Sequence, residues 1–141
     1  MWAVVPRSAR WGRHPGATLD IVYGLPVDTD LSAFVGLELQ LVSISLHQVN
    51  ADFDGVRKIG ISIEGDYAVA PAGMAQVRYT AAPDGAAAPA SLLGSQVAGV
   101  RVAEPGTTSV HFAGGATITV FDSEAHYESY QIYISERIIV V

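Results

Sequence analysis

Four side chains able to bind metal alternate near the end of the chain: Asp122, Glu124, His126 and Glu128. In an extended segment they would share one face and could hold a hard cation or Zn²⁺. A metal site also needs a defined ligand geometry and a supporting shell of hydrogen bonds, and this pattern indicates neither. We therefore interpret the segment as a solvated acidic loop and expect neither a metal nor a cofactor.

The chain contains no recognisable catalytic set, which favours a non-enzymatic role. Its four histidines are scattered, and no serine lies in the Gly-x-Ser-x-Gly turn typical of hydrolases. Asp52 and Asp54 flank Phe53 beside a predicted turn, where acidic residues are common. The glycines Gly114 and Gly115 lack a Lys-Ser/Thr partner and precede no helix, so they do not form a phosphate-binding loop.

Three tyrosines close to these acids, Tyr127, Tyr130 and Tyr133, indicate a surface for a partner. In a regular strand Tyr127 and Tyr133 face one way and Tyr130 faces the other. Tyrosine is a common anchor of protein interfaces, yet it also packs within sheets with its hydroxyl hydrogen-bonded, and both interpretations stay open. The predicted interaction residues are Asp122, Glu124, His126, Tyr127, Glu128 and Tyr130.

The composition is that of one globular domain. The chain has 141 residues, of which 50% are hydrophobic and 16% are charged, which is enough apolar material for a core and too little charge for a disordered chain. No cysteine is present, so disulfides and thiol catalysis are excluded. No apolar run approaches the roughly 20 residues of a membrane span, and we expect a cytoplasmic protein without a membrane partner.

The charges are unevenly distributed along the chain. The net charge is −6, but Arg7, Arg10 and Arg13 all precede the first acid, Asp20. The remaining 5 basic and 14 acidic residues give the rest of the chain a charge of −9. Such a body repels phosphate backbones, so we expect no nucleic acid as a partner and consider a basic protein more suitable.

The elements that would position these residues read mainly as strands. Residues 1–17 show no periodic pattern and are interpreted as a loose arm, although their two tryptophans could dock on the body or on a partner. The alternation in 43–46 and in 59–63, with the Asp54-Gly55 turn signal between them, predicts a hairpin. A short helix or loop fits 81–90, where Pro89 limits any helix.

The last four residues, 138–141, are Ile-Ile-Val-Val. They are too apolar for a free tail, so they should form a strand that is buried either in the core or in a subunit interface. The second possibility predicts a homodimer through this C-terminal strand.

An internal repeat relates about 34–67 to about 92–123. The pairs Phe34/Leu92 and Gly36/Gly94 are separated by 58 positions, and after one inserted residue Phe53 matches Phe112. Further matches pair Val42 with Val100, Ile44 with Val102, Ile59 with Ile118 and Ile61 with Val120. The shared pattern predicts two related β-meanders, and it leaves 122–132 without a counterpart in the first half.

Residues 31–141 resemble a group of small bacterial proteins with no assigned activity. The resemblance rests on the segments LLGSQVAGVRV, FAGGATITVFDS and HYESYQI, and on FVGLELQLVSISLHQVNADFDG in the first half. It implies a β fold and supplies no catalytic residue.

The sequence therefore predicts one mainly β domain over 18–141, with little helix. The two related meanders would form an antiparallel sandwich or a partly open barrel of about eight strands, joined by a short helix or loop. Two functions are compatible with it. One is a non-enzymatic protein-interaction module that binds a basic protein through an acidic surface. The alternative is a small-ligand-binding or enzymatic β domain with a pocket between the two repeats.

Overall fold

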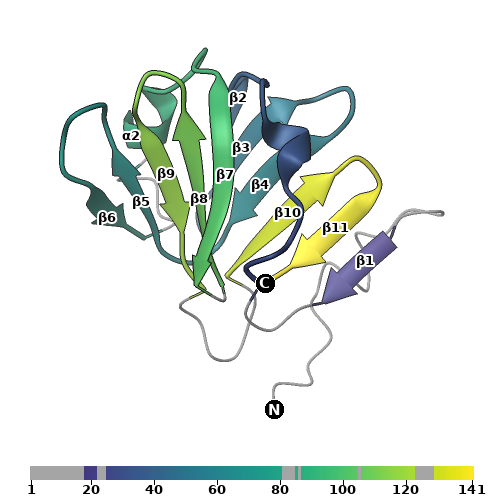
Figure 1. Ribbon diagram of the computed structural model, residues 1–141. Coiled ribbons are helices and arrows are strands. Elements are labelled where there is room, and N and C mark those ends of the chain that lie inside the picture. The colour runs from purple at the N-terminus through teal and green to yellow at the C-terminus, as the bar shows by residue number, and fades with distance from the viewer. Residues whose placement is uncertain (1–17, 22–24, 81–84, 86, 105, 123–128) are drawn as a thin grey trace.

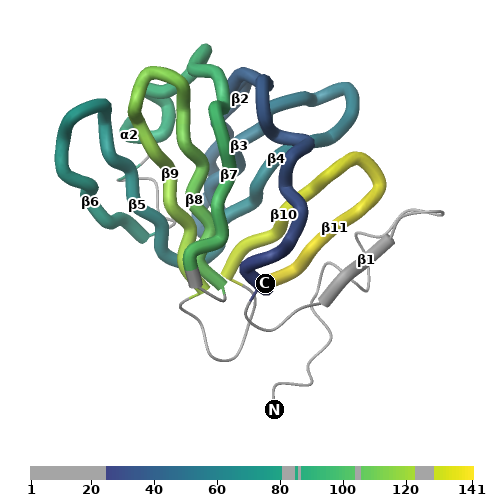
Figure 2. The backbone as a smooth tube through the Cα atoms, viewed as in Figure 1, coloured from purple at the N-terminus to yellow at the C-terminus, as the bar shows by residue number. Residues whose placement is uncertain are grey.

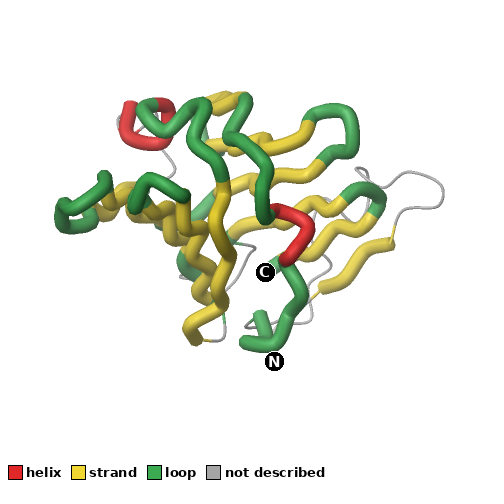
Figure 3. Tube along the Cα trace, turned by 45° about the horizontal axis from the view of Figure 1, so that its top comes forward, coloured by secondary structure: helices red, strands yellow, loops and turns green. Residues whose placement is uncertain are grey.

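The computed structural model describes the whole chain except residues 1–17, 22–24, 81–84, 86, 105 and 123–128. Most of the described chain is strand, with two short helical segments (Figure 3). The elements are β1 (Thr18–Ile21), η1 (Ser32–Phe34), β2 (Leu41–Ile44), β3 (Val49–Asp54), β4 (Ile59–Ile63), β5 (Tyr67–Ala70), β6 (Val77–Tyr79), α2 (Ala87–Ala90), β7 (Val97–Glu104), β8 (Thr107–Phe112), β9 (Thr117–Val120), β10 (Tyr130–Ile134) and β11 (Arg137–Val140).

The strands form two sheets that are not closed into a barrel, as the predicted β-sandwich requires (Figure 1). The first sheet has the order β1-β11-β10-β4-β3-β2 and the second has the order β6-β5-β9-β8-β7. Only β1, which lies parallel to β11, departs from antiparallel pairing. The mainly β fold class is confirmed, but the described chain has eleven strands and not about eight.

The two sheets exchange hairpins. The meander β2-β3-β4 is extended by β10 and β11, whereas β5 and β6, which follow β4 in the sequence, extend the meander β7-β8-β9. Figure 2 shows the consequence, because the yellow C-terminal hairpin lies beside the teal β4. Neither meander completes its sheet with its own continuation, so the two halves fold as one unit.

A local two-fold relation lies where the two meanders begin. Glu38 and Gln96, which are 58 positions apart, pair with each other in an isolated antiparallel bridge. Four backbone hydrogen bonds surround the bridge, in two pairs that the two-fold relation connects. In the first pair, Gly36 N–H donates to Val97 O (2.9 Å) and Gly94 N–H donates to Leu39 O (2.8 Å). In the second pair, Leu39 N–H donates to Ser95 O (2.9 Å) and Val97 N–H donates to Leu37 O (2.7 Å). Gly36 and Gly94 have φ of 88° and 87°, the left-handed region that favours glycine. This symmetry agrees with the predicted repeat, whose origin by duplication stays a prediction.

The repeat needs two corrections. Ile61 lies opposite Ala51 and Ile118 lies opposite Val110, so Ile61 and not Ile59 is the counterpart of Ile118. Ile61 comes eight positions after Phe53, whereas Ile118 comes six positions after Phe112, and this difference of two shifts the match. In addition, residues 130–132 do not lack a counterpart, because β10 pairs with β4 as β5 pairs with β9.

The core lies between the sheets. Phe53 is at its centre, 5.4 Å from the ring of Phe34 in an edge-on contact and 6.3 Å from the stacked ring of Phe112. Phe34 is supplied by η1, which contacts both β4 and β7. The prediction of a buried C-terminal strand is confirmed, since Ile139, Val140 and Val141 are buried within the chain itself. Because β11 has β10 on one side and β1 on the other, its burial needs no partner, and the homodimer through it stays a prediction.

Candidate functional site

The predicted interaction residues lie mostly outside the described part of the chain. Glu124, His126, Tyr127 and Glu128 are not described, which leaves Asp122 and Tyr130. Within the described residues no group of three or more His, Asp or Glu side chains is placed to hold a metal ion. The predicted arm over 1–17 is also outside the described residues.

Asp122 is half-buried and has a local structural partner. Its carboxylate accepts a hydrogen bond from Ser129 Oγ at 3.1 Å. It also packs against Gly106, where φ is 89° and an added Cβ would come within 2.5 Å of the Asp122 Cβ. The contact ties the end of β9 to the β7–β8 turn.

Tyr130 is wholly buried, so it presents no surface to a partner. Its hydroxyl donates to Gly106 O at 3.1 Å and shares a second hydrogen bond with Thr108 Oγ1 at 3.0 Å. Burial raises the pKa of the Tyr130 hydroxyl well above its ordinary value, so the group stays neutral. Of the two open interpretations of this tyrosine, the structure supports the packed one.

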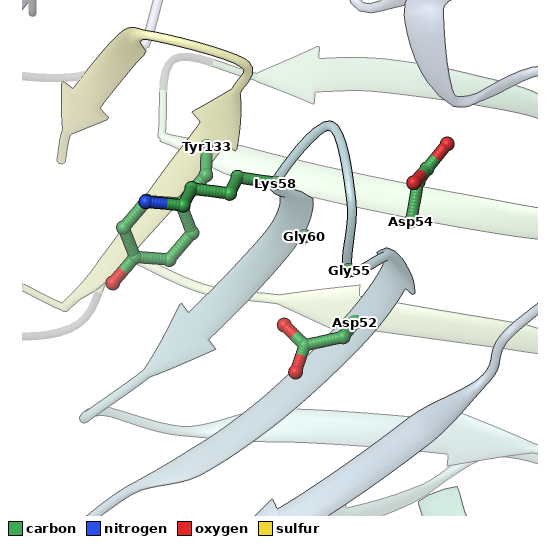
Figure 4. A pocket seen from close by; sticks show the side chains of 6 residues that line it. All are labelled: Asp52, Asp54, Gly55, Lys58, Gly60 and Tyr133. Atoms are coloured by element: carbon green, nitrogen blue, oxygen red, sulfur yellow. The ribbon is translucent and has the colours of Figure 1, made fainter.

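A different group of residues forms a hollow of about 240 Å³ on the outer face of the first sheet. Its lining residues are Asp52, Asp54, Gly55, Lys58, Gly60 and Tyr133. Strand register brings three of them into one row, because Gly60 on β4 lies opposite Asp52 on β3 and also opposite Tyr133 on β10. We call this site the Asp52 hollow. In Figure 4 Asp52 and Tyr133 lie on either side of Gly60, and Asp54 points away from them.

Gly60 makes the floor of the Asp52 hollow. A Cβ at this position would come within 2.9 Å of Asp52 Oδ1 and within 2.7 Å of Ala51 O. The missing side chain therefore lets the Asp52 carboxylate lie over the strand. On the far side, the Tyr133 hydroxyl donates to Gln131 Oε1 at 3.1 Å, which holds its ring along β10.

The Asp52 carboxylate accepts no hydrogen bond and forms no ion pair with the described residues. Desolvation by burial raises the pKa of Asp52 above its ordinary value. The Asp52 oxygens are not among the buried side-chain atoms of the described residues that lack a partner, so water reaches them. A carboxyl group with a raised pKa that borders a hollow is a candidate for ligand binding.

The carboxylate of Asp54, two residues further along β3, accepts its hydrogen bonds from residues of the β3–β4 turn. It accepts the backbone N–H groups of Arg57 (3.0 Å) and Val56 (3.1 Å), and the Arg57 Nε at 2.6 Å. These hydrogen bonds, led by the one from the Arg57 backbone, lower the pKa of Asp54. Asp54 therefore fixes the turn that forms the rim of the hollow.

Lys58 completes the rim and has an unusual backbone. Its φ is 56°, in the left-handed region that a residue with a side chain seldom adopts. The Lys58 carbonyl accepts the N–H of Ser135 at 3.1 Å, which ties the β3–β4 turn to the β10–β11 turn. The side chain extends toward Tyr133 in Figure 4, so a positive charge borders the hollow opposite Asp52.

We expect Asp52→Asn to raise the free energy of unfolding at neutral pH. The fold raises the pKa of Asp52, so ionisation costs stability as the pH rises past the ordinary value of 3.8, and below that value the carboxyl is protonated in both states. The gain, at most about 1 kcal/mol because solvent screens this site, should vanish near pH 3. Thermal unfolding at the two pH values measures it.

Asp54→Asn is the matched control and should have the opposite sign. The lowered pKa of Asp54 stabilises the fold above the ordinary value, and that contribution disappears as the pH falls through the lowered pKa. Equal pH profiles for the two variants would contradict the different environments assigned to these carboxylates.

Comparison of the chain with protein-family models, with curated proteins and with solved structures finds no match. In addition, the described residues contain no helix long and apolar enough to cross a membrane. The case for a function therefore depends on the geometry of the site.

The Asp52 hollow was not predicted from the sequence. Asp52 looked like an ordinary turn acid, and Gly60 looked like the small residue between two strand isoleucines. A two-residue turn at Asp54-Gly55 would set Asp52 opposite Arg57. The longer turn and the register shift between Asp52 and Asp54, which pair Asp52 with Gly60, have no signal in the sequence. No local pattern connects either residue with Tyr133.

Proposed function

We propose that the protein is a non-enzymatic binding module that holds a small, neutral, hydroxyl-rich ligand, such as one sugar ring, in the Asp52 hollow. The observation that carries the proposal is the half-buried Asp52 carboxylate, which has no partner among the described residues. A ligand hydroxyl that donates to this carboxylate would offset the cost of its burial.

The charges of the hollow favour a neutral ligand. Asp54 is neutralised by Arg57, which leaves Asp52 and Lys58 as opposite charges on two sides. A simple cation would be repelled by Lys58 and a simple anion by Asp52. A polyol has neither problem, because its hydroxyls donate to a carboxylate and accept from an ammonium group.

Size and shape support the same ligand class. The hollow of about 240 Å³ is smaller than the roughly 300–1,000 Å³ of pockets for drug-sized molecules. It suits one ring, which could lie on the flat glycine floor with its C–H face against the Tyr133 ring. The ligand could be a free monosaccharide or the end of a longer glycan.

The other functions predicted from the sequence have less support in the described residues. Between the repeats, where a pocket was predicted, the rings of Phe34, Phe53 and Phe112 fill the core. Binding of a basic protein through 122–130 stays a prediction that depends on 123–128, since Tyr130 is buried and Asp122 is bound to Ser129.

Titration of the ¹⁵N-labelled protein with a panel of monosaccharides tests the proposal. At least one sugar should shift the amide resonances of Gly60 and Tyr133. Asp52→Asn should weaken its binding about tenfold or more, because a hydrogen bond to a charged group contributes about 1.5–3 kcal/mol. Asp28→Asn, which changes an exposed carboxylate outside the lining of the hollow, should leave the affinity within twofold.

Cyclohexanol and a simple alkylamine are useful negative probes, since the first lacks the set of hydroxyls and the second is only a cation. Equal binding of either would contradict a polyol site. The proposal also fails if no sugar shifts Gly60 or Tyr133, or if Asp28→Asn weakens binding as much as Asp52→Asn does.

A further inference from the structure

The strand β2 forms an edge of the first sheet, and the short helix α2 lies close to it. The strand pairs with β3 alone, from Leu41 opposite Asp52 to Ile44 opposite Val49. Its outer side therefore carries backbone groups that no described strand covers. Leu41 is 53% exposed, Ile44 is 41% exposed and Leu46, just beyond the strand, is 71% exposed.

The alternation of backbone hydrogen bonds along β2 identifies which of its N–H and C=O groups face away from β3. Ser45 N–H donates to Gln48 O, and residues of an antiparallel strand alternate between bonding inward and facing outward. Ser43 and Leu41 therefore bond to β3 along with Ser45. The N–H and C=O groups of Val42 and Ile44 point away from the sheet.

The edge strand β2 lacks the charged residues that the other three edge strands carry. Charged residues and proline on an edge strand discourage pairing with another chain. The edge strands β1, β6 and β7 contain Asp20, Arg78 and Arg101, respectively. The segment 41–46, Leu-Val-Ser-Ile-Ser-Leu, has no charge and no proline.

We propose that β2 pairs antiparallel with β2 of a second copy of the chain, about a two-fold axis at Ser43. In this register the outward-facing N–H and C=O groups of the two copies lie opposite each other. Val42 forms a doubly hydrogen-bonded pair with the partner's Ile44, and Ile44 forms one with the partner's Val42. Four hydrogen bonds result. The same pairs are apolar and would cover the exposed side of Ile44.

The strand is complementary to itself, which is why a second copy is the occupant. The axis places Ser43 beside the partner's Ser43 and Leu41 beside the partner's Ser45, so no like charges meet. A two-fold dimer needs only one such surface. The inference goes beyond the proposed ligand site and does not depend on it.

A single cysteine tests the register directly, since the chain has none of its own. Ser43→Cys should give a disulfide-linked dimer under mild oxidation, because non-hydrogen-bonded antiparallel neighbours lie about 4.5 Å apart at Cα, within disulfide range. Ser45→Cys is the matched control and should stay uncrosslinked, because the axis sets position 45 opposite the partner's Leu41 and therefore far from the second introduced thiol.

Sedimentation and native mass spectrometry provide an independent test. The wild type should dimerise as concentration rises, and Ile44→Pro, which removes an outward N–H in each copy, should weaken the dimer roughly thirtyfold. Ser43→Lys and Ser43→Asp should each be monomeric and should form a mixed dimer when combined. Val77→Lys, at a 52% exposed position on the edge strand β6, should leave the dimer intact.

Several outcomes would overturn the proposal. A wild type that is monomeric at all accessible concentrations would do so, as would assembly into more than two copies. A dimer that persists in Ile44→Pro and Ser43→Lys would place the interface elsewhere, for example at the C-terminal hairpin. Equal crosslinking of Ser43→Cys and Ser45→Cys would reject the register. Loss of sugar binding with dimerisation retained would leave this inference standing.

Discussion

Phe53→Ala should lower the free energy of unfolding by about 3–5 kcal/mol, as is usual when a buried phenylalanine is truncated. Phe53 is 1% exposed and contacts the rings of Phe34 and Phe112, which come from opposite sides of the core. Neither neighbour can move in to fill the space without leaving its own strand or helix. Urea unfolding monitored by circular dichroism measures the loss.

Val56→Ala is the control for Phe53→Ala, because Val56 is 95% exposed in the nearby turn and should change stability by less than about 0.5 kcal/mol. Phe112→Ala should resemble Phe53→Ala, since the two rings hold matching places in the two meanders. A loss below about 1 kcal/mol for Phe53→Ala would show that the core tolerates the cavity and would contradict the central position of this ring.

Removal of Ile139–Val141 should abolish cooperative folding. All three residues are buried, and the Val141 backbone accepts the N–H of Ser129 at 2.7 Å and donates to Tyr130 O at 3.0 Å. The truncation also takes away half of the strand that pairs with both β10 and β1. The loss should approach the whole stability of a typical domain, about 5–15 kcal/mol, and proton NMR dispersion would report it.

A milder change separates folding from association. Val141→Ala should stay folded and lose about 1–3 kcal/mol. If the truncated chain remained folded and had only become monomeric, the C-terminal strand would serve mainly as a subunit interface, and its burial within one chain would not be what stabilises the fold.

Asp52 connects the stability of the protein with its proposed function. The carboxylate that the ligand would use is the same one whose ionisation the fold disfavours. Asp52→Asn should therefore give a more stable protein that binds less well, a trade-off expected of residues that serve binding.

Some of the strands could be predicted from the sequence. Alternating isoleucines indicated β4, and the apolar end indicated β11. The predicted hairpin between 43–46 and 59–63 was wrong in its first strand, because 43–46 covers the end of β2, and β3 pairs with β4. The two confirmed strands depend on local side-chain patterns, which neighbouring residues decide. The short helix α2 also fell within the predicted 81–90 segment.

The count and connection of strands were harder to predict. β1 and β6 are short. The residues of β6 do not alternate between buried and exposed positions, so no apolar alternation predicts this strand from the sequence. The third strand of the repeat was matched two residues out of register, because isoleucines alternate there and a shift of two keeps the same face.

The sequence by itself determined that this is an acidic, mainly β chain with no recognisable catalytic motif. Only the tertiary structure decided that the meanders exchange their last hairpins, which brings Tyr133 beside Gly60 and buries Tyr130. The physical reason is that a hairpin is specified by adjacent residues. The pairing of β10 with β4 depends on which sheet edge is free and which apolar faces must be covered, and these are properties of the assembled chain.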